Sequence, residues 1–554
     1  MKTLSPLQTT RYKYEPEIPQ VLKTSADLVV SEAGEAVLPR NNSQTIASFF
    51  PKTIGQPLLS FKSGENKTAK NKRKIGVLLS GGQASGGHNV ISGLYDAIKE
   101  ANKDSELFGF HMGPDGLIKN DYEILTDEKI GNYRNTGGFD IIGSGRTKIE
   151  SESQVAAVVN TVKESDLDAI VVIGGDDSNT NAAFLAEQFK QKGLKTQVIG
   201  VPKTIDGDLK NDYIETSFGF DTAAKVYSEC IGNLETDTAS AQKYWNFVKL
   251  MGRSASHITL ECALQVHPNI ALIGEEIAAK NMTLKQILDN ICDTIAKRAE
   301  KGENYGVILI PEGIIEFIPE TKALIEELNK NWIEYEKVYT TLTTLAAKKD
   351  WLKNQLSAAA FETLDQLPDA IAEQFLGLRD PHGNIAVSQI ETEKLFITMI
   401  KNRLDEMEKA GTYKGKFAPI SLFYGYEGRS VFPTNFDANY CYALGKTAFL
   451  LIANGATGYI SCVNNLSKPP AEWIPRGIPL TMMMDMEVRK GKSVPVISKS
   501  LVNLDGPVFK EFAEKRSQWA VSTDYRNPGA IQYFGPTEVC DTITETLKLE
   551  SAAK

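Results

Sequence analysis

The sequence has few cysteines, no long apolar run and no excess of positive charge. Six cysteines are spread widely over 554 residues, and no two of them form a Cys-x-x-C pair. This pattern gives no support to a disulfide framework, a zinc ribbon or a thioredoxin-type redox site, so we expect free thiols in a reducing compartment. No apolar stretch approaches the roughly 20 residues of a membrane helix, and residues 1–20 are too polar for a secretory signal. We therefore expect a soluble, cytoplasmic protein without a membrane partner.

The charge balance is acidic, with 61 Lys and Arg against 70 Asp and Glu and a formal net charge of -9. Such a balance argues against a nucleic-acid coat protein, whose affinity comes from neutralising phosphates, so we expect no nucleic-acid partner. It leaves room for an anionic small molecule, because phosphate sites are built locally from backbone N–H groups and a few Lys or Arg. We accordingly interpret the basic run 67–74 as a solvated linker.

From Lys74 onward, short apolar runs that end in glycine or proline turns alternate with helical patterns. This alternation is typical of an α/β fold, in which helices cover both faces of a parallel sheet. Ligands of such sheets bind at the carboxyl ends of the strands, so we expect the polar residues there to converge on one crevice. The predicted strands are 75–79, 168–173, 198–201, 244–250, 305–310, 418–424 and 458–463.

The length predicts two to four domains. We interpret residues 1–70 as an N-terminal extension that packs on a domain behind it. Residues 71–235 form one predicted α/β domain, with later segments available to complete it, and residues 236–554 form a second. Residues of about 316–415 are a predicted helical insertion, because the stretch 320–368 is rich in Glu, Lys, Ala and Leu and has no glycine. We expect a helical pair or hairpin there, with its apolar stripe packed in a core.

The first predicted strand is followed by a glycine-rich loop, Ser80-Gly81-Gly82-Gln83-Ala84-Ser85-Gly86-Gly87. A loop between a strand and a helix suits phosphate, since backbone N–H groups and the helix dipole both favour an anion. The loop is not a Walker A motif, because no Gly-Lys-Ser/Thr ends it, and it lacks the dinucleotide-binding glycine spacing. A tight turn that requires small residues is the alternative interpretation.

Two further turns carry charge. Gly143-Ser144-Gly145-Arg146 follows the mostly apolar residues 139–142, which we interpret as a strand, and an Arg at a strand end suits bidentate phosphate binding. Gly174-Gly175-Asp176-Asp177 follows another predicted strand, and adjacent carboxylates can hold Mg²⁺ together with substrate phosphates. A surface arginine and an ordinary helix N-terminus with acidic residues are the respective alternatives.

The densest group is Pro202-Lys203-Thr204-Ile205-Asp206-Gly207-Asp208. A lysine can neutralise a transferring phosphoryl group, and an aspartate can accept the proton of the attacking hydroxyl. Each such turn also has a simpler interpretation, as a surface turn with solvated charges. Three more turns end apolar runs, namely 251–253, 311–313 and 426–429.

In this order along the chain, the motifs resemble those of the phosphofructokinases, and in particular the long, diphosphate-dependent members of the family. The resemblance runs from about Lys74 to Val463. It implies two Rossmann-like parallel-sheet domains of the phosphofructokinase type, with the N-terminal extension and the helical insertion added. It also implies reversible phosphoryl transfer from diphosphate to the C1 hydroxyl of fructose 6-phosphate, giving fructose 1,6-bisphosphate and phosphate.

The resemblance further implies roles for residues at the donor. Asp206 would be the catalytic base, Lys203 and Asp177 would complete the catalytic set, and Asp176 would ligate Mg²⁺. Diphosphate would contact Gly82 and Arg146.

The resemblance likewise implies a set of residues that contact fructose 6-phosphate. Lys243 and Tyr244 match positions that reach the sugar site of a neighbouring subunit, which implies a homodimer. The full set is Thr204, Ile205, Asp206, Lys243, Tyr244, Met251, Gly252, Arg253, Glu312, Tyr426, Glu427, Gly428 and Arg429.

The expected phosphoryl donor depends on two positions. ATP-using relatives have Gly-Gly-Asp-Gly and Pro-Gly-Thr-Ile-Asp where this chain has Asp177 and Lys203 in place of glycine. Asp177 puts bulk and charge where the α-phosphate of a nucleotide would lie, and two like charges about 4 Å apart repel by roughly 4 kcal/mol at a dielectric near 20. Lys203 supplies a cation beside the transferred group, which diphosphate needs because it has no adenosine to position it. Lys203 should also lower the pKa of Asp206 and keep it ionised.

Three alternatives remain. An ATP-dependent 6-phosphofructokinase is disfavoured by Asp177 and Lys203. A NAD or lipid kinase shares a Gly-Gly-Asp-Gly turn, but it would not predict the other motifs. A non-catalytic regulatory subunit of the same fold would be marked by degraded catalytic positions, whereas Asp176, Asp206 and Arg253 are all present.

Overall fold

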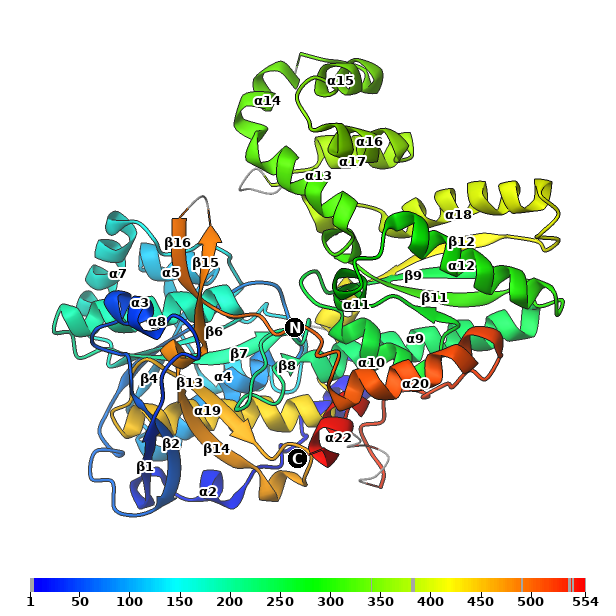
Figure 1. Ribbon diagram of the computed structural model, residues 1–554. Coiled ribbons are helices and arrows are strands. Elements are labelled where there is room, and N and C mark those ends of the chain that lie inside the picture. The colour runs from blue at the N-terminus through cyan, green and yellow to red at the C-terminus, as the bar shows by residue number, and fades with distance from the viewer. Residues whose placement is uncertain are drawn as a thin grey trace. The chain divides into compact units, whose positions relative to one another are not determined.

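The structure is a computed structural model that describes residues 4–339, 341–379, 384–489, 492–536, 540 and 543–553 (Figure 1). The chain forms two compact units, each assembled from separate segments. The first unit comprises Met1–Ala223, Tyr426–Ser500 and Ile531–Ser551, and the second comprises Ala224–Gly425, Leu501–Ala530 and Ala552–Lys554. The domain boundary expected at residue 235 stays a prediction.

The first unit is built on an open, ten-stranded mixed sheet in which β8 pairs with β7 beside the main strand order β1-β2-β14-β13-β7-β6-β3-β4-β5. The central strands β13, β7, β6, β3 and β4 are mutually parallel, and the outer strands are antiparallel. The strands are β1 (Val29–Ala36), β2 (Pro57–Ser63), β3 (Lys74–Leu79), β4 (Glu106–Phe110), β5 (Tyr122–Ile124), β6 (Ala169–Gly174), β7 (Gln197–Thr204), β8 (Phe218–Gly219), β13 (Tyr459–Asn464) and β14 (Ile474–Pro479).

Helices cover both faces of this sheet (Figure 1). On one face α4 (Gly87–Ala101) packs along α19 (Asn435–Ala453), and on the other α8 (Asp176–Gln191), α7 (Glu152–Glu164) and α5 (Pro114–Lys119) pack over an apolar core. Every residue of β6 is buried, which explains why this strand is an unbroken apolar run in the sequence. The shorter helices of this unit are α1 (Pro6–Arg11), α2 (Gln20–Lys23), α3 (Ser43–Phe49), α6 (Asp127–Gly131) and α22 (Glu545–Ala552), and the hairpin of β15 (Met484–Arg489) and β16 (Lys492–Ile497) forms a separate two-stranded sheet.

Two sequence-based expectations concern this unit. The N-terminal extension supplies strands β1 and β2 to the edge of the large sheet, where β2 pairs with β14. The strand predicted over 139–142 is wrong. The backbone turns there, because the N–H of Gly143 donates to the carbonyl of Phe139 over 2.8 Å. The apolar side chains of this stretch are buried, but in a turn.

The second unit has a four-stranded, fully parallel sheet with the order β10-β11-β9-β12. Helices α12 and α18 pack on the face that carries Trp245 and Phe247. The strands are β9 (Trp245–Leu250), β10 (Ile270–Ala271), β11 (Gly306–Pro311) and β12 (Pro419–Tyr424), and the helices are α9 (Phe220–Ala241, from residue 224 onward in this unit), α10 (His257–Val266), α11 (Gly274–Ala279), α12 (Leu284–Ala299), α18 (Thr392–Lys409) and α20 (Pro507–Val521).

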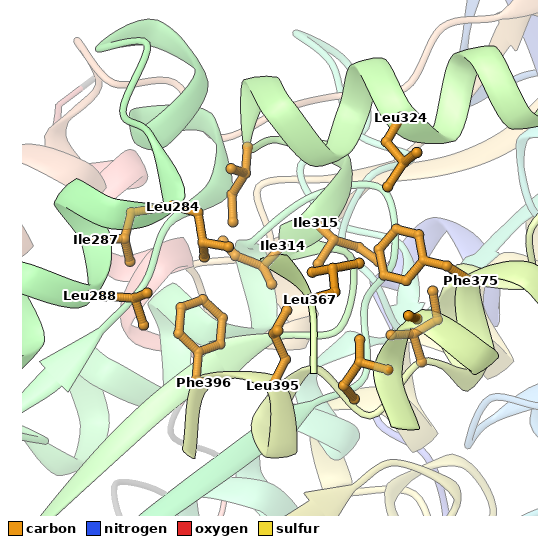
Figure 2. Packing of buried hydrophobic residues seen from close by; sticks show 14 of the residues in the cluster. Leu284, Ile287, Leu288, Ile314, Ile315, Leu324, Leu367, Phe375, Leu395 and Phe396 are labelled. Atoms are coloured by element: carbon orange, nitrogen blue, oxygen red, sulfur yellow. The ribbon is translucent and has the colours of Figure 1, made fainter. Parts of the chain in front are cut away.

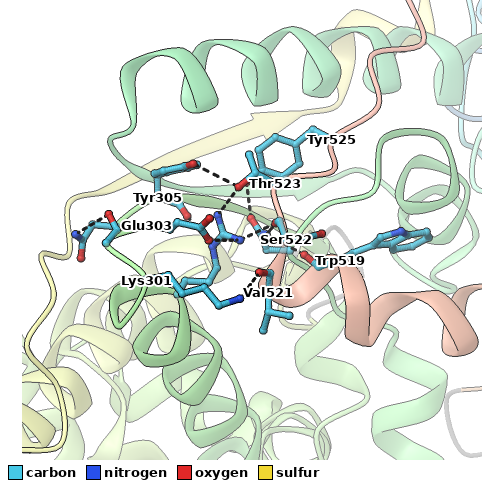
Figure 3. Close-up of polar contacts among 12 residues, drawn as sticks. Lys301, Glu303, Tyr305, Trp519, Val521, Ser522, Thr523 and Tyr525 are labelled. Carbon is cyan, nitrogen blue, oxygen red and sulfur yellow. Dashed lines mark hydrogen bonds and ion pairs between the residues drawn. The ribbon is translucent and has the colours of Figure 1, made fainter.

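The segment after α20 is attached to this unit by a polar network around the buried Arg298 (Figure 3). The Arg298 guanidinium donates to the carbonyls of Tyr305 and Ser522 over 3.1 and 2.6 Å. Lys301 donates to the carbonyl of Val521 over 3.0 Å. These bonds attach residues 521 and 522 to α12 and to the start of β11.

The predicted insertion is helical, but it is more than a pair of helices. Between residues 319 and 366 the chain forms four helices, and a fifth follows. Two of the breaks coincide with N-cap side chains: the hydroxyl of Thr344 accepts from the N–H of Ala347, and that of Ser357 accepts from the N–H of Ala360. The helices are α13 (Pro319–Lys330), α14 (Trp332–Tyr339), α15 (Leu345–Leu352), α16 (Ala358–Gln366) and α17 (Asp369–Gly377).

The apolar stripe of the insertion packs in a core, as predicted. Leu324 of α13, Leu367 at the end of α16 and Phe375 of α17 lie in one buried cluster with Ile314 and with Phe396 of α18 (Figure 2). The insertion therefore extends the core of the second unit. In the described part of the chain, no helix has the length and apolar character needed to cross a membrane.

Candidate active site

The glycine-rich loop connects β3 to α4 in the first unit, at the carboxyl end of its strand. The N–H of Ser80 donates to the carbonyl of Ile173 over 2.8 Å, and the N–H of Gly81 donates to that of Gly145 over 2.9 Å. Gly86 caps α4 with a φ of 109°, and a Cβ there would lie 2.3 Å from Sγ of Cys441. Glycine is thus required at residue 86 both by backbone conformation and by close packing.

Three cationic side chains converge on Gly82 of this loop. Nζ of Lys203 donates to the carbonyl of Gly82 over 2.8 Å. A Cβ on Gly82 would lie 2.6 Å from a terminal nitrogen of Arg429 and 3.4 Å from one of Arg146. Arg429 also donates to the side-chain oxygen of Gln83 over 2.5 Å. Positive charge beside a bare backbone position is an arrangement that suits a small polyanion.

Lys203 lies at the end of β7 and is only 7% exposed. Burial lowers the pKa of its ammonium group to about 8, because desolvation disfavours the charged form. Asp206 acts in the opposite direction, and Arg429 lowers the pKa further. The low pKa of Lys203 therefore results mainly from burial, and a bound anion beside the ammonium group would raise it.

The two adjacent aspartates open helix α8, directly after β6. Asp176 is mostly buried and Oδ2 of its carboxylate accepts no hydrogen bond from the described residues. Burial raises its pKa, and the neighbouring Asp177 raises it further. Asp177 is half exposed and forms an ion pair with Lys148, whose Nζ lies 3.2 Å from Oδ1.

The turn after β7 carries the remaining acidic groups. The N–H of Asp206 donates to the hydroxyl of Thr204 over 3.0 Å, and Gly207 has a φ of 74°. Ile205 and Asp208 are both buried. Gly174 of β6 pairs with Pro202 of β7. Asp177 comes three residues after Gly174, and Lys203 comes directly after Pro202.

The second unit carries another polar group at the carboxyl ends of β9 and β11. The N–H of Gly252 donates to a carboxylate oxygen of Glu312 over 3.0 Å, and Gly252 has a φ of 128°. The guanidinium of Arg253 donates twice to Glu316, over 3.2 and 3.1 Å. Met251 is only 9% exposed, whereas the side chain of Arg253 is 42% exposed.

Lys243 and Tyr244 lie at the opposite end of β9. Both are exposed and precede the first residue of the strand, whereas Met251 follows the last. A six-residue strand is about 20 Å long, so these two side chains do not join the turn at 251–253 of their own chain.

The last segment assigned to the sugar phosphate, Tyr426–Arg429, forms a short 3-10 turn in the first unit. Tyr426 is 72% exposed and Glu427 is exposed, whereas Gly428 is buried. Arg429 turns to the glycine-rich loop as described above. The predicted site residues thus occupy strand ends on both sheets, and their expected convergence on one crevice stays a prediction.

Sequence reasoning missed several residues of the first unit that lie at these turns. Lys499 lies 3.9 Å from Asp176, Lys148 pairs with Asp177, and Ser178 donates to the hydroxyl of Ser80 over 2.8 Å. Ser178 directly follows the motif Gly174-Gly175-Asp176-Asp177 and could have been found from it. The sequence around Lys499 contains no motif that could have identified it.

Comparison with known proteins places these motifs in one family. Residues 74–348 match the phosphofructokinase family. Over its whole length the chain is 52% identical to the pyrophosphate–fructose 6-phosphate 1-phosphotransferase of Treponema pallidum and covers 98% of that protein. It is also 52% identical to the enzyme of that name from Porphyromonas gingivalis, with 99% of each chain covered.

A solved structure confirms the fold. The crystal structure of the pyrophosphate-dependent phosphofructokinase from Nitrosospira multiformis matches 82% of this chain and 93% of its own, with a TM-score of 0.54 and 16% identity. The predicted α/β fold of the phosphofructokinase type, with open sheets, is confirmed. On the strength of its full-length relatives, this chain belongs to the phosphofructokinase family.

Proposed function

We propose that the protein transfers a phosphoryl group reversibly from diphosphate to the C1 hydroxyl of fructose 6-phosphate, giving fructose 1,6-bisphosphate and phosphate. The observation that carries the choice of donor is the convergence of Lys203, Arg146 and Arg429 on Gly82. Relatives at about half identity over the full length carry the corresponding name, which supports the same activity here.

The donor would bind with its phosphoryl oxygens against these three cations. Charge-assisted hydrogen bonds of this kind are stronger than neutral ones, and a buried site adds to their effect. Lys203 is placed to neutralise charge that develops during transfer, and because it is already fixed to the loop at Gly82 it needs little reorganisation. A small inorganic donor has no remote nucleoside contacts, so these local interactions must supply its positioning.

The residues present also fit a Mg²⁺ ion, which would be held by Asp176. Its buried Oδ2 accepts no hydrogen bond from the described residues, which leaves a carboxylate oxygen available at the start of a helix. Mg²⁺ commonly takes one or two carboxylates together with substrate phosphates and water. When bound, the ion would neutralise negative charge on the phosphoryl oxygens.

Asp206 is the group we assign as general base for the C1 hydroxyl of the sugar. The bond from its N–H to Thr204 fixes the turn that carries it, and its carboxylate interacts electrostatically with the ammonium group of Lys203. Proton transfer to a positioned group of this kind contributes typically about 10²- to 10⁴-fold to the rate. In the reverse direction the same residue would return the proton.

We assign fructose 6-phosphate to the turn at 251–253 and to Glu312 in the second unit. Arg253 can bind a phosphate bidentately, and its present partner Glu316 holds the guanidinium oriented until then. Lys243 and Tyr244 are separated from that turn by the length of β9, which supports a role in the site of a neighbouring subunit and hence a homodimer. All six cysteines are free thiols, which supports a cytoplasmic location.

The donor assignment is tested by assaying the purified protein with Mg²⁺ and fructose 6-phosphate, supplied with either diphosphate or ATP. We expect turnover with diphosphate, in both directions, and little with ATP. The double variant Asp177→Gly, Lys203→Gly should lose diphosphate activity and gain ATP affinity, because bulk and charge leave the position of the α-phosphate. Brisk turnover of the unmodified protein with ATP and none with diphosphate would contradict the assignment. If ATP affinity does not change in the double variant, exclusion of the nucleotide by Asp177 is wrong.

A further inference from the structure

The segment that follows the β15–β16 hairpin crosses between the two acidic turns of the first unit. The N–H of Ile497 donates to the hydroxyl of Thr180 on α8 over 2.9 Å. The N–H of Ser500 donates to the carbonyl of Asp208 over 2.7 Å. Residues 497–500 are therefore held on one side by the helix that begins at Asp176 and on the other by the turn that carries Asp206.

Lys499 lies within this doubly anchored segment. Its Nζ is 3.9 Å from Oδ2 of Asp176, and its side chain is 37% exposed. The separation is too long for a hydrogen bond, so the ammonium group opposes the charge of the carboxylate through space and leaves Oδ2 without a donor. This ammonium is one of the causes that lower the pKa of Asp176, against the dominant effect of burial.

The distribution of charges around the donor site shows why a cation is needed beside Asp176. On the side of Gly82, a polyanion would meet Lys203, Arg146 and Arg429. On the side of α8 it would meet the carboxylates of Asp176 and Asp177, and like charges a few ångströms apart repel strongly in a partly buried site. Lys148 already pairs with Asp177. Lys499 adds positive charge beside Asp176.

From this placement we propose that Lys499 is a donor-binding residue, whose ammonium group offsets Asp176 in the empty site and contacts a phosphoryl oxygen of diphosphate in the filled site. The proposal rests on the proposed function and adds a residue to it. The long, flexible stem of lysine allows its ammonium group to turn from one partner to the other while the backbone on both sides stays hydrogen-bonded. When Asp176 ligates Mg²⁺, the ion balances the charge of its carboxylate, so Lys499 is no longer required to do so.

The test is a binding measurement in the absence of sugar, so that no turnover is required. Methylenediphosphonate, a diphosphate analogue that cannot transfer its phosphoryl group, is titrated with Mg²⁺ into the full-length protein by calorimetry. We expect Lys499→Gln to weaken binding about ten- to a hundredfold, the range for a lost hydrogen bond to a charged group. Lys499→Arg keeps the charge and should stay within about threefold of the unmodified protein.

A matched control is Lys510→Gln, which removes an exposed lysine on α20 of the second unit. Lys510→Gln should bind the analogue as the unmodified protein does. In steady-state assays, Lys499→Gln should raise the KM for diphosphate and leave the KM for fructose 6-phosphate within about twofold. If the Gln variant fails to fold, Lys499→Met keeps most of the aliphatic stem and serves in its place.

Two results would overturn the proposal. One is binding of the analogue by Lys499→Gln as tightly as by the unmodified protein, and the other is an equal rise in the KM values of both substrates, which indicates a general structural effect. Turnover of the unmodified protein with diphosphate, measured in the same series, tests the proposed function separately.

Discussion

Binding of the donor should take up a proton through Lys203. In the empty site, burial lowers the pKa of this ammonium group to about 8, with Asp206 opposing the shift and Arg429 adding to it. A polyanion against Nζ favours the charged form and returns the pKa of Lys203 toward its ordinary value of 10.5 or higher. Lys203 is then charged in both states below pH 8, and proton uptake on binding appears between about pH 8 and 10.5.

The magnitude follows from the two pKa values. At pH 8.5 about a quarter of the empty sites carry the ammonium form, so binding takes up about three-quarters of a proton, against about a tenth at pH 7. Because only the charged form binds well, the apparent Kd should rise about tenfold per pH unit above pH 8. Affinity for diphosphate is therefore greatest below pH 8 and is lost as the pH rises through the pKa of the empty site.

Calorimetric titrations of methylenediphosphonate with Mg²⁺, in buffers of different ionisation enthalpy, measure this uptake. Lys203→Arg is the matched variant, since a guanidinium stays charged over the whole range and should remove the contribution. The difference in proton uptake between the two proteins gives the contribution of Lys203, because protons exchanged by the ligand itself are the same in both titrations. An identical uptake and an identical pH profile of Kd in both proteins would refute the assignment of Lys203 to the donor.

Two further predictions concern the proposed base and the proposed dimer. Asp206→Asn should lower kcat by about 10² or more and change either KM little, because it removes proton acceptance and keeps the shape of the side chain; an unchanged kcat in steady-state assays would exclude Asp206 as the base. Lys243→Ala and Arg253→Ala should each lose most activity alone, and co-refolded mixtures should regain part of it, because some mixed dimers hold one intact site; no recovery in verified heterodimers would contradict sharing of the site between subunits.

The sequence predicts the central architecture well because buried parallel strands are continuous apolar runs. The strands β3, β6, β7, β9 and β11 all follow from that signal, together with the turns at their carboxyl ends. The same signal fails at residues 139–142, where apolar side chains are buried in a turn closed by the bond between Gly143 and Phe139. An apolar run establishes burial, and the hydrogen bonds of the backbone decide whether a strand forms.

The helical insertion and Lys499 show two other limits. Helical periodicity continues across Thr344 and Ser357, so the N-caps that restart helices at these residues are easily missed within a pattern of uniform composition. Lys499 is separated from Asp176 by more than 300 residues, and only the tertiary fold brings its hairpin beside α8. A site residue that lies in a distant segment and has no motif around it cannot be predicted from the local sequence.

The order in which the strands leave the ribosome has a consequence for biogenesis. The early strand β2 is bonded to β1 and, at the edge of the large sheet, to β14, which is synthesised about 400 residues later. A nascent β1–β2 hairpin therefore presents an unpaired edge during most of translation, and such edges invite association with other chains. Pairing of β14 with β2 covers this edge once the segment at 474–479 has been synthesised.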